Sequence, residues 1–176
     1  MADRCDSGGR GSCGTAISWR EATNVTSDQG RATIYQWKPE PVGRILVIEE
    51  DLELARAAGS GLERSEFATT LCADGPEGLQ AALSDRFDLC LVSLTLPGLD
   101  GPGLARRLAA ESPDLPVLFV TADAGSHFEP LIEKLEKLEN CVGVIRKPFA
   151  PEELVDRVAT VIAQRRGRYD EIPDAE

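Results

Sequence analysis

The sequence predicts an α/β fold in which five parallel strands form one doubly wound sheet. Short apolar runs alternate with segments of helical spacing five times between about residues 43 and 166. The runs are apolar at consecutive positions, which is typical of strands buried on both faces of a sheet. Right-handed crossover connections then place helices on both sides of the sheet.

Each strand and helix of this fold can be placed in order along the chain. The expected strands are 44–50 (RILVIEE), 67–72 (FATTLC), 87–93 (FDLCLVS), 116–122 (PVLFVTA) and 141–148 (CVGVIRKP). The expected helices are 52–64, 76–85, 101–112, 128–140 and 150–165. Pro76 and Pro151 suit helix starts, because the first turn leaves backbone amides without a helical partner in any case.

The two ends of the chain differ in composition from this central part. Residues 1–42 are rich in Gly, Ser, Thr and charge without a sustained period, and we expect them to be largely disordered. Within them, ATIYQWKP (32–39) could form an edge strand or dock on a partner. The expected division is an extension over 1–42, a domain over 43–166 and an acidic tail over 167–176.

Charge and hydropathy exclude several classes of function. The net charge of −11 argues against direct binding to nucleic acid or anionic membranes, because phosphates would be repelled. No apolar run reaches the ~20 residues of a membrane-spanning helix, so we expect a cytoplasmic protein. No C-x-x-C pair occurs, and we expect Cys72, Cys90 and Cys141 to be buried and reduced.

Four of the five expected strands end in residues that can do chemistry. Glu49 and Glu50 follow the first strand, Ser93 ends the third, Thr121 ends the fourth and Lys147 ends the fifth. In a doubly wound sheet, ligands bind at the carboxyl ends of the strands, where the strand order reverses. We therefore expect these acids, hydroxyls and one ammonium to meet in a single pocket.

Four motifs in order, ILVIEED, DLCLVSLTLPGLDG, PVLFVTA and RKPF, carry a family resemblance. From about Gly43 to Arg166 the chain resembles the receiver domain of two-component response regulators, which has a flavodoxin-like fold. The resemblance implies that Glu49 and Glu50 occupy the Mg²⁺-binding acidic positions. The phosphoacceptor aspartate falls on Ser93.

The same resemblance assigns three further positions. The hydroxyl that senses the phosphoryl group falls on Thr121, and the lysine that pairs with it falls on Lys147. Lys147 precedes Pro148 across a bond that is often cis in the family. The aromatic switch position falls on Val144, which departs from the commoner Tyr or Phe.

The departure at Ser93 changes the expected chemistry. A serine hydroxyl is neutral at pH 7 and needs a neighbouring base to become a nucleophile. Ser93 also removes one carboxylate from the metal position, and Glu50 is one methylene longer than the usual Asp. We therefore predict weak or absent Mg²⁺ binding, no aspartyl phosphorylation, and a lasting pair between Lys147 and Glu49 or Glu50. The alternative is that residues 49–51 form only an acidic turn that caps the next helix.

These expectations favour a pseudoreceiver that is not an enzyme. It would act alone in bacterial two-component phosphorelay signalling through phosphorylation-independent contacts with a histidine kinase or another signalling protein. One alternative is a receiver that is still phosphorylated at Ser93 with a divalent metal. A second alternative is a small-ligand binder at the switch in strand order. The charged face of the helix expected over 128–140 is either a solvated surface or a partner-docking face.

Overall fold

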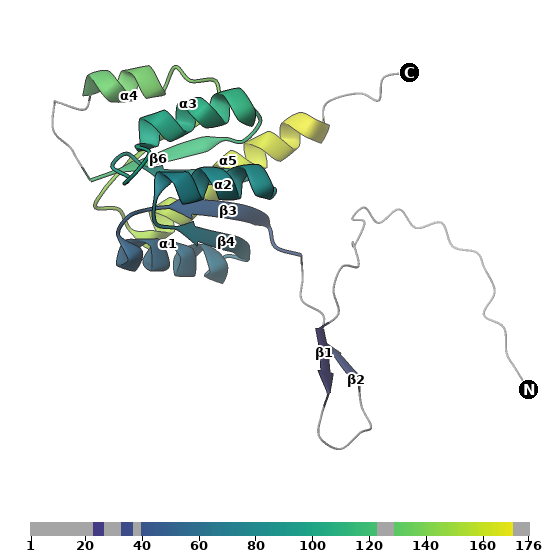
Figure 1. The fold of residues 1–176 in the computed structure, drawn as a ribbon. Helices are drawn as coiled ribbons and strands as arrows, with labels where there is room; N and C mark the ends of the chain where they lie inside the picture. Colours follow the sequence, from purple (N-terminus) through teal and green to yellow (C-terminus); the bar gives the residue numbers. More distant parts are fainter. Residues whose placement is uncertain (1–22, 27–32, 37–39, 123–128, 171–176) are drawn as a thin grey trace, which may run out of the picture. The chain divides into compact units, whose positions relative to one another are not determined.

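Five apolar segments pair into one parallel sheet in the computed structural model of the chain (Figure 1). The structure describes residues 23–26, 33–36, 40–122 and 129–170, with side chains described within 40–122 and 129–166. The strands are β3 (Gly43–Ile48), β4 (Phe67–Cys72), β5 (Leu89–Ser93), β6 (Val117–Thr121) and β7 (Cys141–Arg146). Their order across the sheet is β4-β3-β5-β6-β7, which confirms the predicted doubly wound fold.

Helices cover both faces of this sheet and bury one apolar cluster on each. The helices are α1 (Leu52–Arg64), α2 (Gly75–Ser84), α3 (Gly101–Glu111), α4 (Glu129–Leu135) and α5 (Pro151–Asp170). Alternate residues of β3 serve the two faces: Ile45 joins the cluster under α1 and α5, and Leu46 joins the cluster under α2, α3 and α4. This double burial explains why the strands are apolar at consecutive positions.

Local side chains determine where the helices begin. Asp51, Asp74 and Asp100 precede α1, α2 and α3, and each carboxylate accepts hydrogen bonds from backbone amides of the first turn. Such caps satisfy amides that have no partner within the helix. They fix the direction in which the chain leaves β3, β4 and the loop after β5.

Two helix ends differ from the prediction. The helix expected over 128–140 ends at Leu135, where the chain turns, and Leu138 N–H donates to the Leu135 carbonyl at 3.0 Å. The backbone carbonyl of the buried Asn140 then accepts from Val117 N–H at 2.7 Å, so the chain has left the helix and pairs with β6 just before β7 begins. By contrast, α5 continues to Asp170, into residues that we expected to be tail.

The first 40 residues form a separate unit. Within it, β1 (Thr23–Thr26) pairs antiparallel with β2 (Thr33–Gln36). The segment that could have formed an edge strand thus pairs locally and is not part of the five-stranded sheet. Disorder of the remaining extension stays a prediction, because residues 1–22, 27–32 and 37–39 lie outside the described part of the chain.

The three cysteines of the domain are free thiols. Cys72 and Cys90 are buried as predicted, whereas Cys141 is only half-buried, because it lies on the edge strand β7. Burial raises the pKa of the Cys72 thiol to about 11, and it also raises the pKa of the Cys90 thiol. These two thiols are protonated packing groups at neutral pH.

Candidate functional site

The strand order reverses between β3 and β5, and the predicted residues lie at the carboxyl ends of these and the neighbouring strands. Glu49 follows β3, and the residue as a whole is almost fully buried at 4% exposure. Ser93 is the last residue of β5 and Thr121 is the last of β6, at 3% and 4% exposure. Lys147 follows β7, and its amide donates to the Thr121 carbonyl at 2.7 Å.

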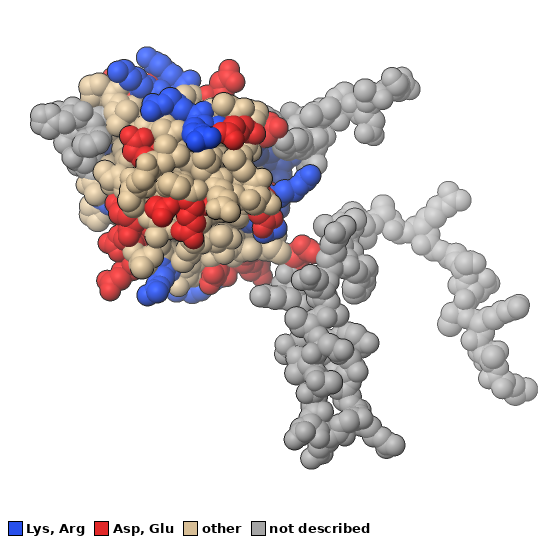
Figure 2. Space-filling model, in the orientation of Figure 1, with Lys and Arg blue, Asp and Glu red and all other residues tan. Residues whose placement is uncertain are grey.

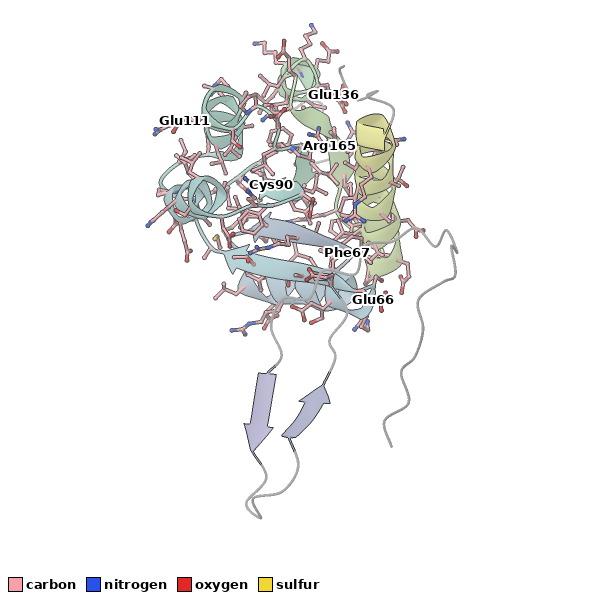
Figure 3. All side chains as sticks on the ribbon, turned by 90° about the vertical axis from the view of Figure 1, so that its right-hand side faces the viewer. Glu66, Phe67, Cys90, Glu111, Glu136 and Arg165 are labelled. Carbon is pink, nitrogen blue, oxygen red and sulfur yellow. The ribbon has the colours of Figure 1, made fainter. Side chains whose placement is uncertain are left out.

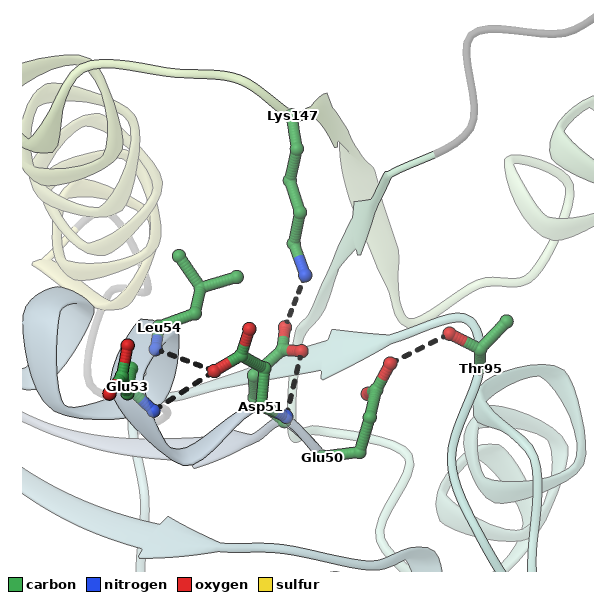
Figure 4. A network of polar contacts seen from close by, with 7 residues as sticks. Glu50, Asp51, Glu53, Leu54, Thr95 and Lys147 are labelled. Atoms are coloured by element: carbon green, nitrogen blue, oxygen red, sulfur yellow. Dashed lines mark hydrogen bonds and ion pairs between the residues drawn. The ribbon is translucent and has the colours of Figure 1, made fainter.

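A buried ion pair joins the first and last of these strand ends. Lys147 Nζ lies 2.7 Å from Glu49 Oε2, and the two side chains are 17% and 6% exposed (Figure 4). Burial raises the pKa of Glu49, while the hydrogen bond and charge of Lys147 act in the opposite direction. The peptide bond that follows Lys147 is cis, as the resemblance implied.

Glu50 lies beside this pair but faces different partners. Thr95 Oγ1 donates to Glu50 Oε1 at 2.9 Å (Figure 4). Partial burial alone would raise the pKa of Glu50, but hydrogen bonds from its backbone amide, Ser93 and Thr95 outweigh burial and lower it. Glu50 is therefore an ionised carboxylate with two hydroxyl partners, and Ser93 is one of them.

Thr95 is a site residue that the sequence prediction missed. It stands two residues beyond Ser93, in the loop that follows β5. The available signal was a second hydroxyl in the loop that leaves the switch point. A hydroxyl in a loop does not by itself indicate a site, and only the contact with Glu50 identifies Thr95 as part of this one.

Asp51 has a structural role. Its Oδ1 accepts from Glu53 N–H at 3.0 Å and from Leu54 N–H at 3.2 Å, and it therefore caps α1 (Figure 4). Its own amide donates to Glu49 Oε1 at 3.4 Å. The interpretation of residues 49–51 as a helix-capping turn holds for Asp51, whereas Glu49 is buried against Lys147.

The backbone around Ser93 is closely packed. A Cβ on Gly101 would lie 2.2 Å from the Ser93 carbonyl oxygen, so only glycine fits where α3 begins. Gly98 in the same loop has a φ of 76°, a left-handed conformation that glycine adopts readily. The loop from β5 to α3 therefore holds Ser93 and Thr95 in place beside Glu50.

The donor set at the strand ends does not fit a hard divalent cation. Mg²⁺ prefers oxygen ligands, most often carboxylates, in near-ideal octahedral geometry. Here one Glu49 oxygen already contacts an ammonium, Ser93 is neutral, and Glu50 accepts from Thr95. Among residues 40–122 and 129–166, no cluster of three or more His, Cys, Asp or Glu side chains could hold a metal ion.

The space left beside Ser93 is small. The cavity between Glu49, Ser93, α1 and α5 has a volume of about 10 Å³. Such a volume is about that of one water site, whereas small-molecule pockets usually measure about 300–1,000 Å³.

Val144, at the aromatic switch position, is half-buried and packs against the apolar cluster under α2 and α3.

Known proteins with similar sequences point to one family. Residues 45–159 match the sequence model described as response regulator receiver domain. The transcriptional regulatory protein CseB of Streptomyces coelicolor is 37% identical over 119 residues, which cover 67% of this chain and 48% of that protein. The transcriptional regulatory protein RprY of Bacteroides fragilis is 30% identical over 128 residues, which cover 71% and 51%. The chain thus spans about half the length of these curated relatives.

Solved structures agree with this assignment. The receiver domain of the Francisella response regulator 1452 has a TM-score of 0.63 and 25% identity, and the match covers 70% of this chain and 98% of that one. A CheY-like receiver domain protein of Methanospirillum hungatei has the same fold, with a TM-score of 0.64 at 21% identity over 71% of this chain and 97% of that one. Because the family match reaches every strand of the sheet and each strand-end residue described above, the chain belongs to the response regulator receiver domain family.

Proposed function

We propose that this receiver domain signals through protein contacts that do not depend on phosphorylation. The observation that carries the proposal is the 2.7 Å ion pair between Lys147 and Glu49, beside a neutral Ser93 at the phosphoacceptor position. In this arrangement the lysine already has an anionic partner in the resting protein. A phosphoryl group is then not needed to bring Lys147 into the site.

The chemistry of Ser93 supports the same conclusion. A serine nucleophile needs a base that removes its proton. The lowered pKa of Glu50 makes its carboxylate a poor base. Burial raises the pKa of Glu49, but one of its oxygens contacts the Lys147 ammonium and the other accepts from Asp51 N–H, so both oxygens already have partners. The Ser93 hydroxyl instead helps to lower the pKa of Glu50, a structural role that requires no turnover.

The test is phosphotransfer from a small phosphodonor, with a variant that restores the carboxylate. Wild type, Ser93→Ala and Ser93→Asp are incubated with acetyl phosphate and Mg²⁺, and their intact masses are measured. We expect no phosphoryl adduct on wild type or Ser93→Ala, and an acid-labile adduct on Ser93→Asp. Acid-labile phosphate on wild type would overturn the proposal.

Two other outcomes of this experiment separate the alternatives. An acid-stable adduct on wild type that Ser93→Ala abolishes would establish phosphorylation at Ser93. Calorimetric titration with Mg²⁺ should give weak or no binding to wild type and tighter binding to Ser93→Asp, because the added carboxylate supplies charge and a ligand. Small-ligand binding at the switch point is disfavoured, since the adjoining cavity holds only about 10 Å³.

The expected partner is a protein, either a histidine kinase or another signalling protein, in the cytoplasm. Receiver domains are signalling modules, and the net charge of −11 disfavours direct binding to nucleic acid. Figure 2 shows acidic and basic side chains in small separate groups around a wide uncharged area on the face that it draws. None of the helices in the described part of the chain is long and apolar enough to cross a bilayer.

The expectation about nucleic acid needs its own measurement, because the names of both curated relatives describe transcriptional regulatory proteins. Fluorescence anisotropy with a mixed-sequence DNA duplex at low salt is the direct assay. We expect no binding by this chain, and salt-dependent binding would contradict this part of the proposal.

A further inference from the structure

A second cavity lies at the opposite end of the sheet from Ser93. It has a volume of about 500 Å³, within the range of small-molecule pockets. Its lining includes Arg44 at the start of β3, Asp88 just before β5 and Leu115 just before β6. Since the strands are parallel, these residues mark the amino end of the sheet, remote from the pair of Lys147 and Glu49.

The floor of this cavity is apolar. Three buried apolar residues of the lining, each less than 9% exposed, are called the floor: Ala82 of α2, Leu115, and Ile162 of α5. Phe87 forms a side wall, and the guanidinium of Arg44 lies 5.6 Å from the centre of its ring. A ligand that enters here would place an apolar body against these side chains.

Arg44 and two aspartates of the lining satisfy one another. Arg44 donates from its guanidinium to Asp85 Oδ2 at 2.6 Å, and its backbone amide donates to Asp88 Oδ2 at 2.7 Å. These contacts tie the start of β3 to the loop between α2 and β5. Because Asp85 and Asp88 already accept hydrogen bonds from Arg44, they form no ion pair with the other arginines of the lining.

Three further arginines line the same cavity. Arg165 and Arg166 of α5 donate to the backbone carbonyls of Asp114 and Val42, which orient the guanidinium groups without neutralising them. Figure 3 shows Arg165 extending from α5 toward the side of the domain where α3 ends at Glu111. Within the described part of the chain, Arg86 forms no ion pair.

The charge of the lining is therefore positive in a strongly acidic protein. Four arginines face three aspartates around the cavity, while the whole chain carries a net charge of −11. Guanidinium groups have several donors in a planar fork, which suits carboxylate and phosphate oxygens. We propose that this cavity binds a small organic anion, with its carboxylate or phosphate group on Arg86, Arg165 and Arg166 and its apolar body on the floor.

Binding is tested on the full chain with four probes. Benzoate and phenyl phosphate combine an anion with an apolar ring, whereas inorganic phosphate and benzyl alcohol each supply one of the two features. We expect one or both aromatic anions to bind, at least about tenfold more tightly than inorganic phosphate or benzyl alcohol. Which of the two binds more tightly identifies the anionic group that the site takes.

Amide chemical shifts locate the site. Benzoate or phenyl phosphate should shift the resonances of Arg44, Asp88 and Leu115, with no shift at Ser93. A Ser93→Ala variant should bind the same probe as wild type does, which separates this site from the function proposed above. If neither aromatic anion binds at millimolar concentration, or if the shifts centre on Ser93, the proposal is wrong.

Variants distinguish a built site from general ion binding. The double variant Arg165→Gln, Arg166→Gln should lower the affinity for the aromatic anion by about tenfold or more. Arg86→Glu is a second variant that preserves folding, because Arg86 is exposed, and it should also abolish binding. Arg107→Gln is the matched control, since Arg107 pairs with Glu111 on the surface of α3. An equal loss in Arg107→Gln would overturn the proposal.

Discussion

Replacing Lys147 with methionine is the sharpest test of the strand-end arrangement. Methionine keeps the apolar stem of the side chain but leaves the Glu49 carboxylate without its partner, at 6% side-chain exposure. Removing one member of a buried pair typically costs about 3–5 kcal/mol, because the remaining charge is uncompensated. Since small domains have about 5–15 kcal/mol of stability, Lys147→Met should lower the free energy of unfolding by a large fraction.

The loss should depend on pH in a defined direction. Burial raises the pKa of Glu49 above its ordinary 4.5, so the folded protein holds this proton to higher pH than the unfolded chain does. The contribution of Glu49 to stability therefore falls as pH rises from the unfolded pKa through the folded pKa. Lys147 opposes the rise in the pKa of Glu49, so its removal should raise the folded pKa further and widen the pH range over which stability falls. We expect Lys147→Met to lose more stability near about pH 8 than near about pH 5.

Urea denaturation of wild type, Lys147→Met, Glu49→Gln and the double variant completes a thermodynamic cycle. Because the two groups are in contact, the double variant should be more stable than the sum of the two single losses predicts, by about 1.5–3 kcal/mol. Additive losses within about 0.5 kcal/mol, or a loss in Lys147→Met that does not change with pH, would refute the pairing that underlies the proposed function.

Three further predictions concern the neighbouring residues. Gly101→Ala should destabilise the domain by about 2 kcal/mol or more, because its Cβ would meet the Ser93 carbonyl at 2.2 Å; unchanged urea unfolding would contradict this packing. Thr95→Val should raise the pKa of Glu50, measured by NMR titration, whereas Thr95→Ser should not. Since the pKa of Glu50 is lowered in the fold, its contribution to stability is present at neutral pH and lost on acidification. Glu50 and Thr95 are both exposed, so solvent screens their contact, and Thr95→Val should lower the stability near pH 7 by only a few tenths of a kcal/mol, and by less in acid. Cys90 should react with a thiol reagent only as fast as the domain unfolds, because burial both shields the thiol and raises its pKa; mass spectrometry of the labelled peptide checks this.

Local patterns in the sequence were enough to predict the fold. Apolar runs identified all five strands of the sheet, and alternating helical segments implied its parallel arrangement. The same patterns placed Glu49, Ser93, Thr121 and Lys147 at strand ends, because a strand end is a local property of the chain. Helix ends were less predictable: α4 stops at Leu135 because the turn into β7 and the buried Asn140 override its helical spacing.

Side-chain partners were decided by the tertiary structure. The sequence allowed Lys147 to pair with either Glu49 or Glu50, and only the fold shows that Glu49 turns inward to Lys147 while Glu50 turns to Thr95. Glu49 and Lys147 lie 98 residues apart, and Glu50 and Thr95 lie 45 apart, so no local pattern connects them. The cavity at the amino end of the sheet likewise gathers arginines from β3, the loop after α2 and α5.

The sequence by itself thus determined the order of the strands and helices along the chain, the residue types at the strand ends, and the absence of a carboxylate at position 93. These follow from burial patterns and chemical identity, which are properties of short segments. The tertiary structure alone decided which of two adjacent glutamates holds the lysine and where the arginines gather. Both depend on the twist and register of strands that are distant in sequence, because ion pairs and hydrogen bonds are sensitive to differences of about 1 Å.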